Sequence, residues 1–305
     1  MIFVTAQPDL TYLLWQVEVQ AYNFYKLGQI KNYKPLVGYV GQPSVYAKEL
    51  IEKGIDIQLF PDTRTNKVYI PSIRPHLLSK FFTANPEMGA QVFYHDADII
   101  FKMLPDFESL LADNIWYVSN TISYIGYNYV LSKGEAQLKQ MADIVGISLD
   151  QVKANELNSG GAQYLFKNIT SDFFNKVEIQ GNELYKAMQL NEPHYQGADK
   201  NPIQKWCADM WAILWNAFLV ADVRVSKELD FCWATDPLIR WDHTKILHLA
   251  GATSNNNGTM FYKGEYINKL PFGVDLTFIE KQNNCSAKYA QLLMEYSRIR
   301  NTIKY

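Results

Sequence analysis

AQVFYHDADIIF, residues Ala90–Phe101, is the stretch from which the rest of the sequence can be interpreted. Gln91–Tyr94 is short, apolar and rich in β-forming residues, which suits a buried strand closed by a polar turn. Asp96 and Asp98 follow with one residue between them. If the strand direction persists, both carboxylates point to one side, where one Mg²⁺ or Mn²⁺ could bind them. The alternative for so short a pattern is an Asp-rich turn that caps the next element.

The residues before this stretch alternate between expected strands and expected helices. The strands are Ile2–Thr5, Pro35–Val40 and Ile55–Phe60, and the helices are Leu10–Leu27, Ser44–Lys53 and Ile73–Phe82, the last with Ser72 as a candidate cap. This βαβαβ order implies parallel strands, and ligands of such sheets gather at the strand carboxyl ends. The sequence therefore predicts an α/β protein whose first half binds a nucleotide.

The second half is less regular. Its expected elements are strands at Asn114–Ser119, Ile125–Leu131 and Ile246–Leu249, helices at Glu135–Val145 and Ser286–Ile303, and a helix from Pro202 to about Val220 that Asp199 or Asn201 can cap. Gly160 and Gly161 predict a tight turn, because glycine permits positive φ and close backbone approach. Residues 170–205 carry loop and turn signals without a clear period. The C-terminal helix is expected to dock onto the domain, and contact with a membrane surface or nucleic acid is the alternative.

Two polar residues interrupt apolar elements. Asp209 is expected about two turns inside its helix, too deep for the helix dipole to explain it. A buried carboxylate is costly without a partner, so Asp209 either has a catalytic purpose or is hydrogen-bonded to a neighbouring loop. His248 lies in the short strand Ile246–Leu249, where it is either a metal ligand or a satisfied core histidine.

Composition excludes several classes of protein. The chain has 305 residues and a net charge of −2, so it has no global attraction to nucleic acid. It lacks an apolar run of the roughly 20 residues that a membrane span requires, and Met1–Val4 leads directly into a strand without a leader pattern. Three distant cysteines without a CxxC pair support neither a zinc knuckle nor a disulfide framework. We therefore expect a soluble, intracellular (cytoplasmic) protein. Neither a Gly-rich phosphate loop nor a G-x-S-x-G motif occurs, which disfavours P-loop enzymes and serine hydrolases.

The order of these motifs resembles that of the DxD-containing GT-A glycosyltransferases. The layout is most similar to the glycogenin and bacterial galactosyltransferase family, which retains anomeric configuration. The resemblance implies one GT-A domain over residues 1–305, with a Rossmann-like, mostly parallel sheet flanked by helices. It implies a nucleotide-sugar half at about 1–118, an acceptor and catalytic half at about 119–270, and a C-terminal helical extension at about 271–305.

The resemblance also implies roles for particular residues. It places a metal on Asp96, Asp98 and His248 and catalysis on Asp209. Donor contacts are implied for Thr5, Ala6, Asp9, Tyr12, Lys80, Asp96, Asn158, Ser159, Gly160, Gly161, Gly251 and Lys263. Two departures from the family pattern stand out, because Met210 replaces the glutamine expected after Asp209, and an insertion at Ser254–Gly258 separates Lys263 from Gly251.

The implied reaction transfers a sugar from a nucleoside-diphosphate sugar, expected to be a UDP-sugar, to an acceptor hydroxyl. Mn²⁺, or Mg²⁺ as the alternative, together with Lys80 or Lys263 would stabilise the leaving diphosphate. Asp209 would act as base, nucleophile or stabiliser of the transition state, and is expected within about 8 Å of the metal. A glycan, a protein side chain and a hydroxymethylated DNA base are all open as acceptors. The competing hypotheses are a nucleotidyltransferase-like enzyme and a non-catalytic carbohydrate-binding protein.

Overall fold

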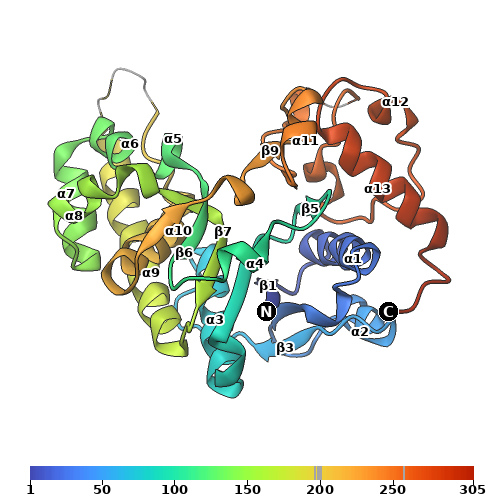
Figure 1. Cartoon of the computed structure of the whole chain (residues 1–305), viewed down its shortest axis with the longest axis horizontal. Helices are drawn as coiled ribbons and strands as arrows, with labels where there is room; N and C mark the ends of the chain where they lie inside the picture. Colours follow the sequence, from blue (N-terminus) through green and yellow to red (C-terminus); the bar gives the residue numbers. More distant parts are fainter. Residues whose placement is uncertain (196, 198–200, 257) are drawn as a thin grey trace. The chain divides into compact units, whose positions relative to one another are not determined.

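The computed structural model describes residues 1–195, 197, 201–256 and 258–305, so the candidate cap Asp199 lies outside the described residues. The chain forms two compact units, each assembled from separate segments (Figure 1). The terminal unit comprises Ile2–Pro61, His95–Phe107 and Glu228–Tyr305, and the central unit comprises Met1, Asp62–Tyr94 and Glu108–Lys227.

The terminal unit contains two groups of strands. The strands β1 (Ile2–Pro8), β2 (Tyr33–Tyr39) and β3 (Gln58–Pro61) are parallel, in the order β3-β2-β1, and α1 (Thr11–Lys26) and α2 (Val45–Glu52) connect them. Five consecutive residues of β1 are buried, as expected for a parallel strand that is covered on both faces. The strands β5 (Ile99–Phe101), β10 (Ile246–His248) and β9 (Phe231–Trp233) form a separate three-stranded sheet.

The central unit is built around the strand order β4-β7-β6-β8. These strands are β4 (Gln91–His95, of which Gln91–Tyr94 belong to this unit), β7 (Gly160–Lys167), β6 (Trp116–Asn120) and β8 (Val223–Val225). The long helix α9 (Ser171–Asn191) packs against α3 (Ile73–Ala84) and α10 (Ala208–Val220). The remaining α-helices of the chain are α4 (Phe107–Leu110), α5 (Ile122–Ile125), α6 (Tyr127–Ser132), α7 (Glu135–Val145), α8 (Leu149–Ala154), α11 (Ile239–His243), α12 (Thr277–Glu280) and α13 (Ser286–Ile299).

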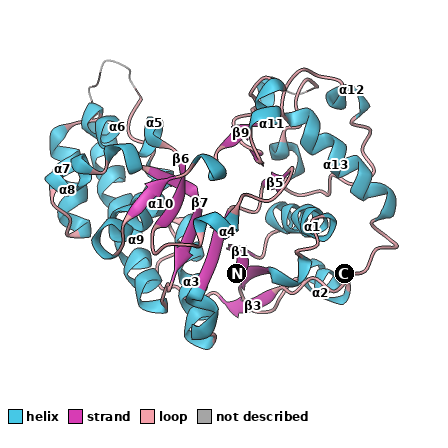
Figure 2. Cartoon of the chain, in the orientation of Figure 1, coloured by secondary structure: helices cyan, strands magenta, loops and turns pink. Residues whose placement is uncertain are grey.

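The predicted fold class, a mostly parallel α/β protein flanked by helices, is confirmed (Figure 2). Among the described residues, no helix is both long enough and apolar enough to cross a membrane. The proposed division into halves near residue 118 stays a prediction.

The structure contradicts the expectations for residues 170–205 and for Ile125–Leu131. Residues 170–205 contain the 21-residue helix α9, whose buried Phe174, Val177, Gly181, Leu184 and Met188 follow a regular helical spacing of three and four. The expected strand Ile125–Leu131 is instead the end of α5 and most of α6. The backbone N–H groups that open α6 donate to the Glu156 carboxylate, a distant acceptor that outweighs the β-propensity of the segment.

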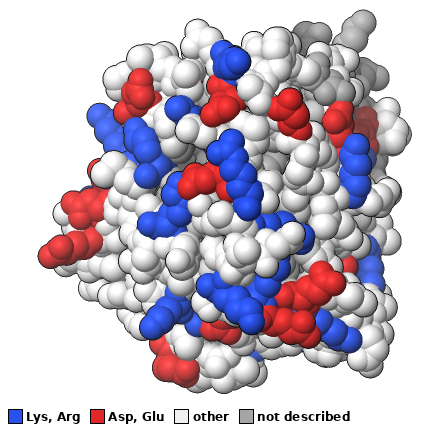
Figure 3. Space-filling view, turned by 90° about the vertical axis from the view of Figure 1, so that its right-hand side faces the viewer, with Lys and Arg blue, Asp and Glu red and all other residues white. Residues whose placement is uncertain are grey.

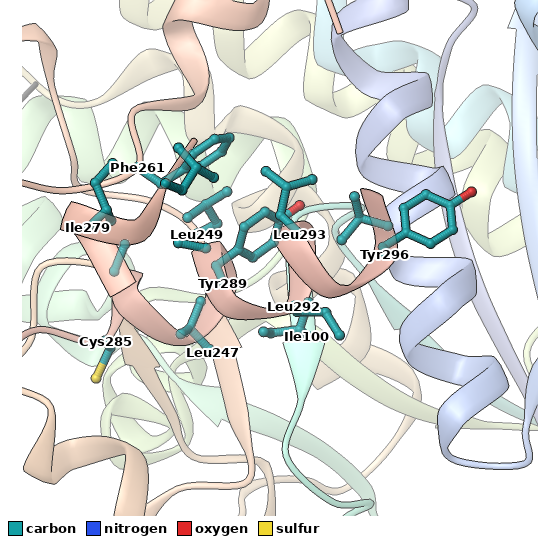
Figure 4. Packing of buried hydrophobic residues seen from close by; sticks show 14 of the residues in the cluster. Ile100, Leu247, Leu249, Phe261, Ile279, Cys285, Tyr289, Leu292, Leu293 and Tyr296 are labelled. Carbon is teal, nitrogen blue, oxygen red and sulfur yellow. The ribbon is translucent and has the colours of Figure 1, made fainter. Parts of the chain in front are cut away.

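The C-terminal helix α13 docks onto the terminal unit as predicted. It packs against α1, and its buried side chains Tyr289, Leu292, Leu293 and Tyr296 belong to one apolar cluster with Ile100, Leu247 and Leu249 (Figure 4). Lys and Arg side chains lie among Asp and Glu side chains over the described part of the face shown in Figure 3. The charge of that face is therefore mixed.

Candidate functional site

Strand pairing in the terminal unit brings Asp96, Asp98 and His248 together. Asp96 and Asp98 lie in the turn between β4 and β5, and His248 ends β10. Strand β5 runs antiparallel to β10 with Ile99 opposite His248. The Leu249 N–H donates to the Asp98 carbonyl (2.9 Å), which extends this pairing to the turn itself.

The three side chains form a group of suitable size for one divalent ion. The Nε2 atom of His248 lies 3.3 Å from Asp98 Oδ1 and 3.6 Å from Asp96 Oδ2, and the ligand atoms of the group all lie within 4.8 Å of one another. Bonds of about 2.1 Å place neighbouring ligands of an octahedral ion about 3 Å apart, so the group needs only small adjustments to close on a metal. Two carboxylates and one imidazole suit Mn²⁺ or Mg²⁺.

Aromatic packing orients the His248 ring. The ring lies over Trp233 (centroids 5.1 Å apart, planes 30° apart) and also contacts Phe231. Its Nδ1 atom is buried and has no hydrogen-bond partner among the described residues. A metal-binding histidine commonly donates this second N–H to a carboxylate or carbonyl, so here the aromatic walls take over the orienting role.

Lys263 contacts the metal group directly. Its ammonium binds Oδ2 of Asp98, the oxygen that does not face His248. Burial alone would raise the pKa of Asp98, but the Lys263 ammonium and His248 outweigh burial and hold this pKa well below its usual range. Burial would lower the pKa of Lys263, whereas Asp98 raises it, and the net shift is upward. Asp98 and Lys263 are therefore an ionised pair.

The segment around Lys263 is anchored despite the insertion that precedes it. Lys263 opens a short 3-10 helix that ends at Tyr266, whose ring stacks on Phe261 (5.2 Å, 11°). The Trp15 indole N–H donates to the Tyr266 carbonyl (3.1 Å). The insertion Ser254–Gly258 therefore still allows Lys263 to reach Asp98.

The other predicted donor residues of the terminal unit lie on β1, in the turn between β1 and α1, on α1 and in the loop after β10. Thr5 and Ala6 are buried, and the Thr5 hydroxyl donates to Gln7 (3.0 Å). Both oxygens of Asp9 accept hydrogen bonds from Ser44, which caps α2. Tyr12 lies in the first turn of α1, where burial raises its pKa and the Lys263 ammonium opposes this rise. Gly251 adopts a left-handed φ of +88°. A donor contact by any of these residues stays a prediction.

In the central unit, Asp209 is the centre of a buried hydrogen-bond network. Its side chain is 2% exposed; Oδ1 accepts from the Tyr69 hydroxyl (2.7 Å) and Oδ2 from Arg74 Nη2 (2.7 Å). The Asp209 backbone N–H donates to the same Tyr69 hydroxyl (2.9 Å). Arg74, a cation that binds Asp209, is a residue that sequence reasoning missed. Lys80, which was predicted to face the donor, lies further along the same helix α3.

The expected depth of Asp209 in its helix is wrong. Helix α10 begins at Ala208, because Lys205–Cys207 form a separate 3-10 turn, so Asp209 lies in the first helical turn. The helix dipole therefore favours this carboxylate, contrary to the prediction. Its distance from the metal group stays a prediction.

The glycines after Asn158 and Ser159 leave no room for a side chain, because neighbouring residues pack closely against their backbone. Asn158 ends a 3-10 helix, Ser159 is buried, and Gly160 and Gly161 open β7. A Cβ on Gly160 would lie 2.3 Å from the Ser119 carbonyl oxygen, and one on Gly161 would lie 2.7 Å from the Met210 methyl.

The tight turn predicted for these glycines is wrong, because both lie in β7 and neither has a positive φ, whereas the close approach of their backbone to neighbouring residues is as predicted. The left-handed residue is Ala162 (φ 65°), where β7 bulges against β6.

Comparisons with known proteins give weak similarities. No protein-family model and no curated protein matches the sequence. An apo structure of the bifunctional glycosyltransferase WbbM aligns at 12% identity and TM-score 0.49, over 92% of this chain and 51% of that one. The galactosyltransferase LgtC, in complex with donor and acceptor sugar analogues, aligns at 14% identity and TM-score 0.39, over 82% and 87% of the two chains. The glycosyltransferase GlyE of Streptococcus pneumoniae aligns at 11% identity and TM-score 0.42, over 100% and 64%. At these values the function must be argued from the site.

Proposed function

We propose that the chain is a metal-dependent GT-A glycosyltransferase that moves a sugar from a UDP-sugar to an acceptor hydroxyl, with retention of configuration. The observation that supports this proposal is the group of Asp96, Asp98 and His248 with the Lys263 ammonium beside it. Carboxylate and imidazole ligands would hold Mn²⁺ or Mg²⁺, and a lysine at the same place would bind the diphosphate. The retaining family and the UDP donor come from the motif resemblance.

The chain's residues divide the reaction into two tasks. When bound, the metal supplies positive charge that stabilises the leaving diphosphate. Lys263 donates a charge-assisted hydrogen bond to the same diphosphate, and Lys80 is the second candidate for this contact. Asp209 acts on the sugar as base, nucleophile or stabiliser of positive charge. Tyr69 and Arg74 orient Asp209, because each holds one of its two carboxylate oxygens.

A panel of nucleotide sugars tests the proposal. Nucleotide release would be followed with Mn²⁺ and with excess chelator, in wild type and in Asp98→Asn and His248→Ala. We expect release only with metal, from UDP-sugars above all, and a loss of most turnover in both variants. Matched controls are Asp242→Asn and His243→Ala, which change exposed residues of α11 in the same unit and should leave turnover unchanged.

The same panel separates the alternatives. Pyrophosphate release from a nucleoside triphosphate would instead favour a nucleotidyltransferase. Sugar binding without turnover would favour the non-catalytic hypothesis. Full activity in excess chelator would contradict metal dependence.

A further inference from the structure

Asp98 uses its two oxygens for two different partners. Oδ1 faces Nε2 of His248, and Oδ2 binds the Lys263 ammonium. The Asp98 side chain is 8% exposed, while Lys263 is 26% exposed, so the lysine reaches a nearly buried carboxylate from the more open side. This contact places a cation directly on the group that is proposed to hold the metal.

The charges of the group explain why a cation is needed there. Asp96 and Asp98 are two carboxylates in close proximity, and such a pair is unfavourable without positive charge nearby. Lys263 supplies one positive charge. A divalent ion bound to both carboxylates would supply two, and it would repel an ammonium that remained on Asp98.

We propose that Lys263 is a tethered counter-ion that competes with the metal for Asp98 and moves to the diphosphate when the metal binds. This inference rests on the proposed function. The backbone around Lys263 is anchored through Phe261 and Tyr266, whereas the four-carbon side chain of Lys263 is flexible enough to change partner. The exchange keeps the carboxylates neutralised in both states.

The exchange makes metal and donor binding interdependent. A metal alone must displace the ammonium from Asp98, so the apparent dissociation constant of the metal is the intrinsic one divided by the fraction of molecules in which the Lys263–Asp98 contact is open. A diphosphate offers the displaced ammonium a new partner. Linkage then requires that the donor strengthen metal binding by the same factor by which the metal strengthens donor binding.

Lys263→Met removes the ammonium and keeps most of the side-chain volume. If the contact is occupied in all but a few per cent of molecules, the variant should bind Mn²⁺ roughly 10- to 100-fold more tightly than wild type. Its affinity for UDP at saturating Mn²⁺ should fall by about ten-fold or more, because one charge-assisted hydrogen bond is lost. Opposite changes in the two affinities distinguish exchange from a structural role, which would weaken both.

Calorimetric titration with Mn²⁺ alone, then with UDP at saturating Mn²⁺, measures the two affinities. Lys281→Met, an exposed lysine in the same unit, is the control and should bind both like wild type. Lys263→Gln is the second variant in case methionine impairs folding, and a melting curve checks both. Unchanged or weaker Mn²⁺ binding in the folded Lys263 variants, with wild type binding Mn²⁺, would overturn the inference and leave the proposed function standing. Absence of Mn²⁺ binding in wild type and variants alike would overturn both.

Discussion

Asp209→Asn separates the structural and catalytic roles of Asp209, the most deeply buried carboxylate among the described residues of the central unit. Asparagine keeps the shape of the side chain and an oxygen for the Tyr69 hydroxyl, but it removes the charge that pairs with Arg74. Loss of one partner of a buried ion pair costs about 3–5 kcal/mol. The Arg74 side chain is 21% exposed, and water can partly replace its partner, so we expect a loss of roughly 2–3 kcal/mol in unfolding free energy.

Turnover should fall much further than this stability loss explains. If Asp209 acts on the sugar, the folded variant should lose roughly two or more orders of magnitude in turnover, with little change in UDP affinity. Urea unfolding gives the free energy, and turnover would be measured well below the onset of unfolding. Asp172→Asn is the matched control, because Asp172 is an exposed aspartate in the first turn of α9.

The single variant Arg74→Met and the double variant Asp209→Asn/Arg74→Met complete a double-mutant cycle of unfolding free energies. A coupling of about 2 kcal/mol between the two positions would measure the ion pair itself. Near-normal turnover in folded Asp209→Asn, together with the expected stability loss, would refute the catalytic role and leave Asp209 as a structural residue.

Three further predictions concern stability and are measured by urea unfolding. Glu18→Gln should cost about 3 kcal/mol, because the fully buried Glu18 carboxylate binds two cationic side chains and two tyrosine hydroxyls; a loss below 1 kcal/mol would contradict this. Gly161→Ala should cost about 1–3 kcal/mol, since its methyl group would overlap Tyr164 and Met210, and an unchanged midpoint would show that β7 can relax. Burial lowers the pKa of His95 to about 4, so below pH 6.5 the unfolded chain takes up the proton first. Stability should therefore fall by about 3 kcal/mol between pH 6.5 and 4, and His95→Asn should remove most of this dependence.

The residues of the metal group could be named from the sequence only with the help of the motif resemblance. Two aspartates after a buried strand and a histidine in a second short strand each left a structural alternative open, and the resemblance selected the three side chains together. Their mutual contact depends on the antiparallel pairing of β5 with β10, two three-residue strands with no local pattern that names the partner. The motif resemblance indicated which three residues belong together, and the fold brings their side chains into contact.

The surroundings of Asp209 show why other parts could not be predicted. A buried carboxylate implies a hydrogen-bond or cationic partner, but no pattern in the sequence indicates that Arg74 of α3 pairs with Asp209. The expected helix start at Pro202 followed the ordinary start signals. The chain instead inserts a 3-10 turn before Ala208, which moves Asp209 into the first turn. Local sequence patterns indicate neither the pairing of Asp209 with Arg74 nor the 3-10 turn before Ala208.

Binding of UDP with and without Mn²⁺ tests most directly the claim that Asp96, Asp98 and His248 hold the ion that serves the donor. Calorimetry would be run on wild type, on His248→Ala and on the exposed control His243→Ala. We expect tight UDP binding only with Mn²⁺ in wild type and in the control, and a loss of this metal-dependent gain in His248→Ala. Equal UDP affinity with Mn²⁺ and with chelator in wild type, or an undiminished Mn²⁺ effect in His248→Ala, would contradict this claim.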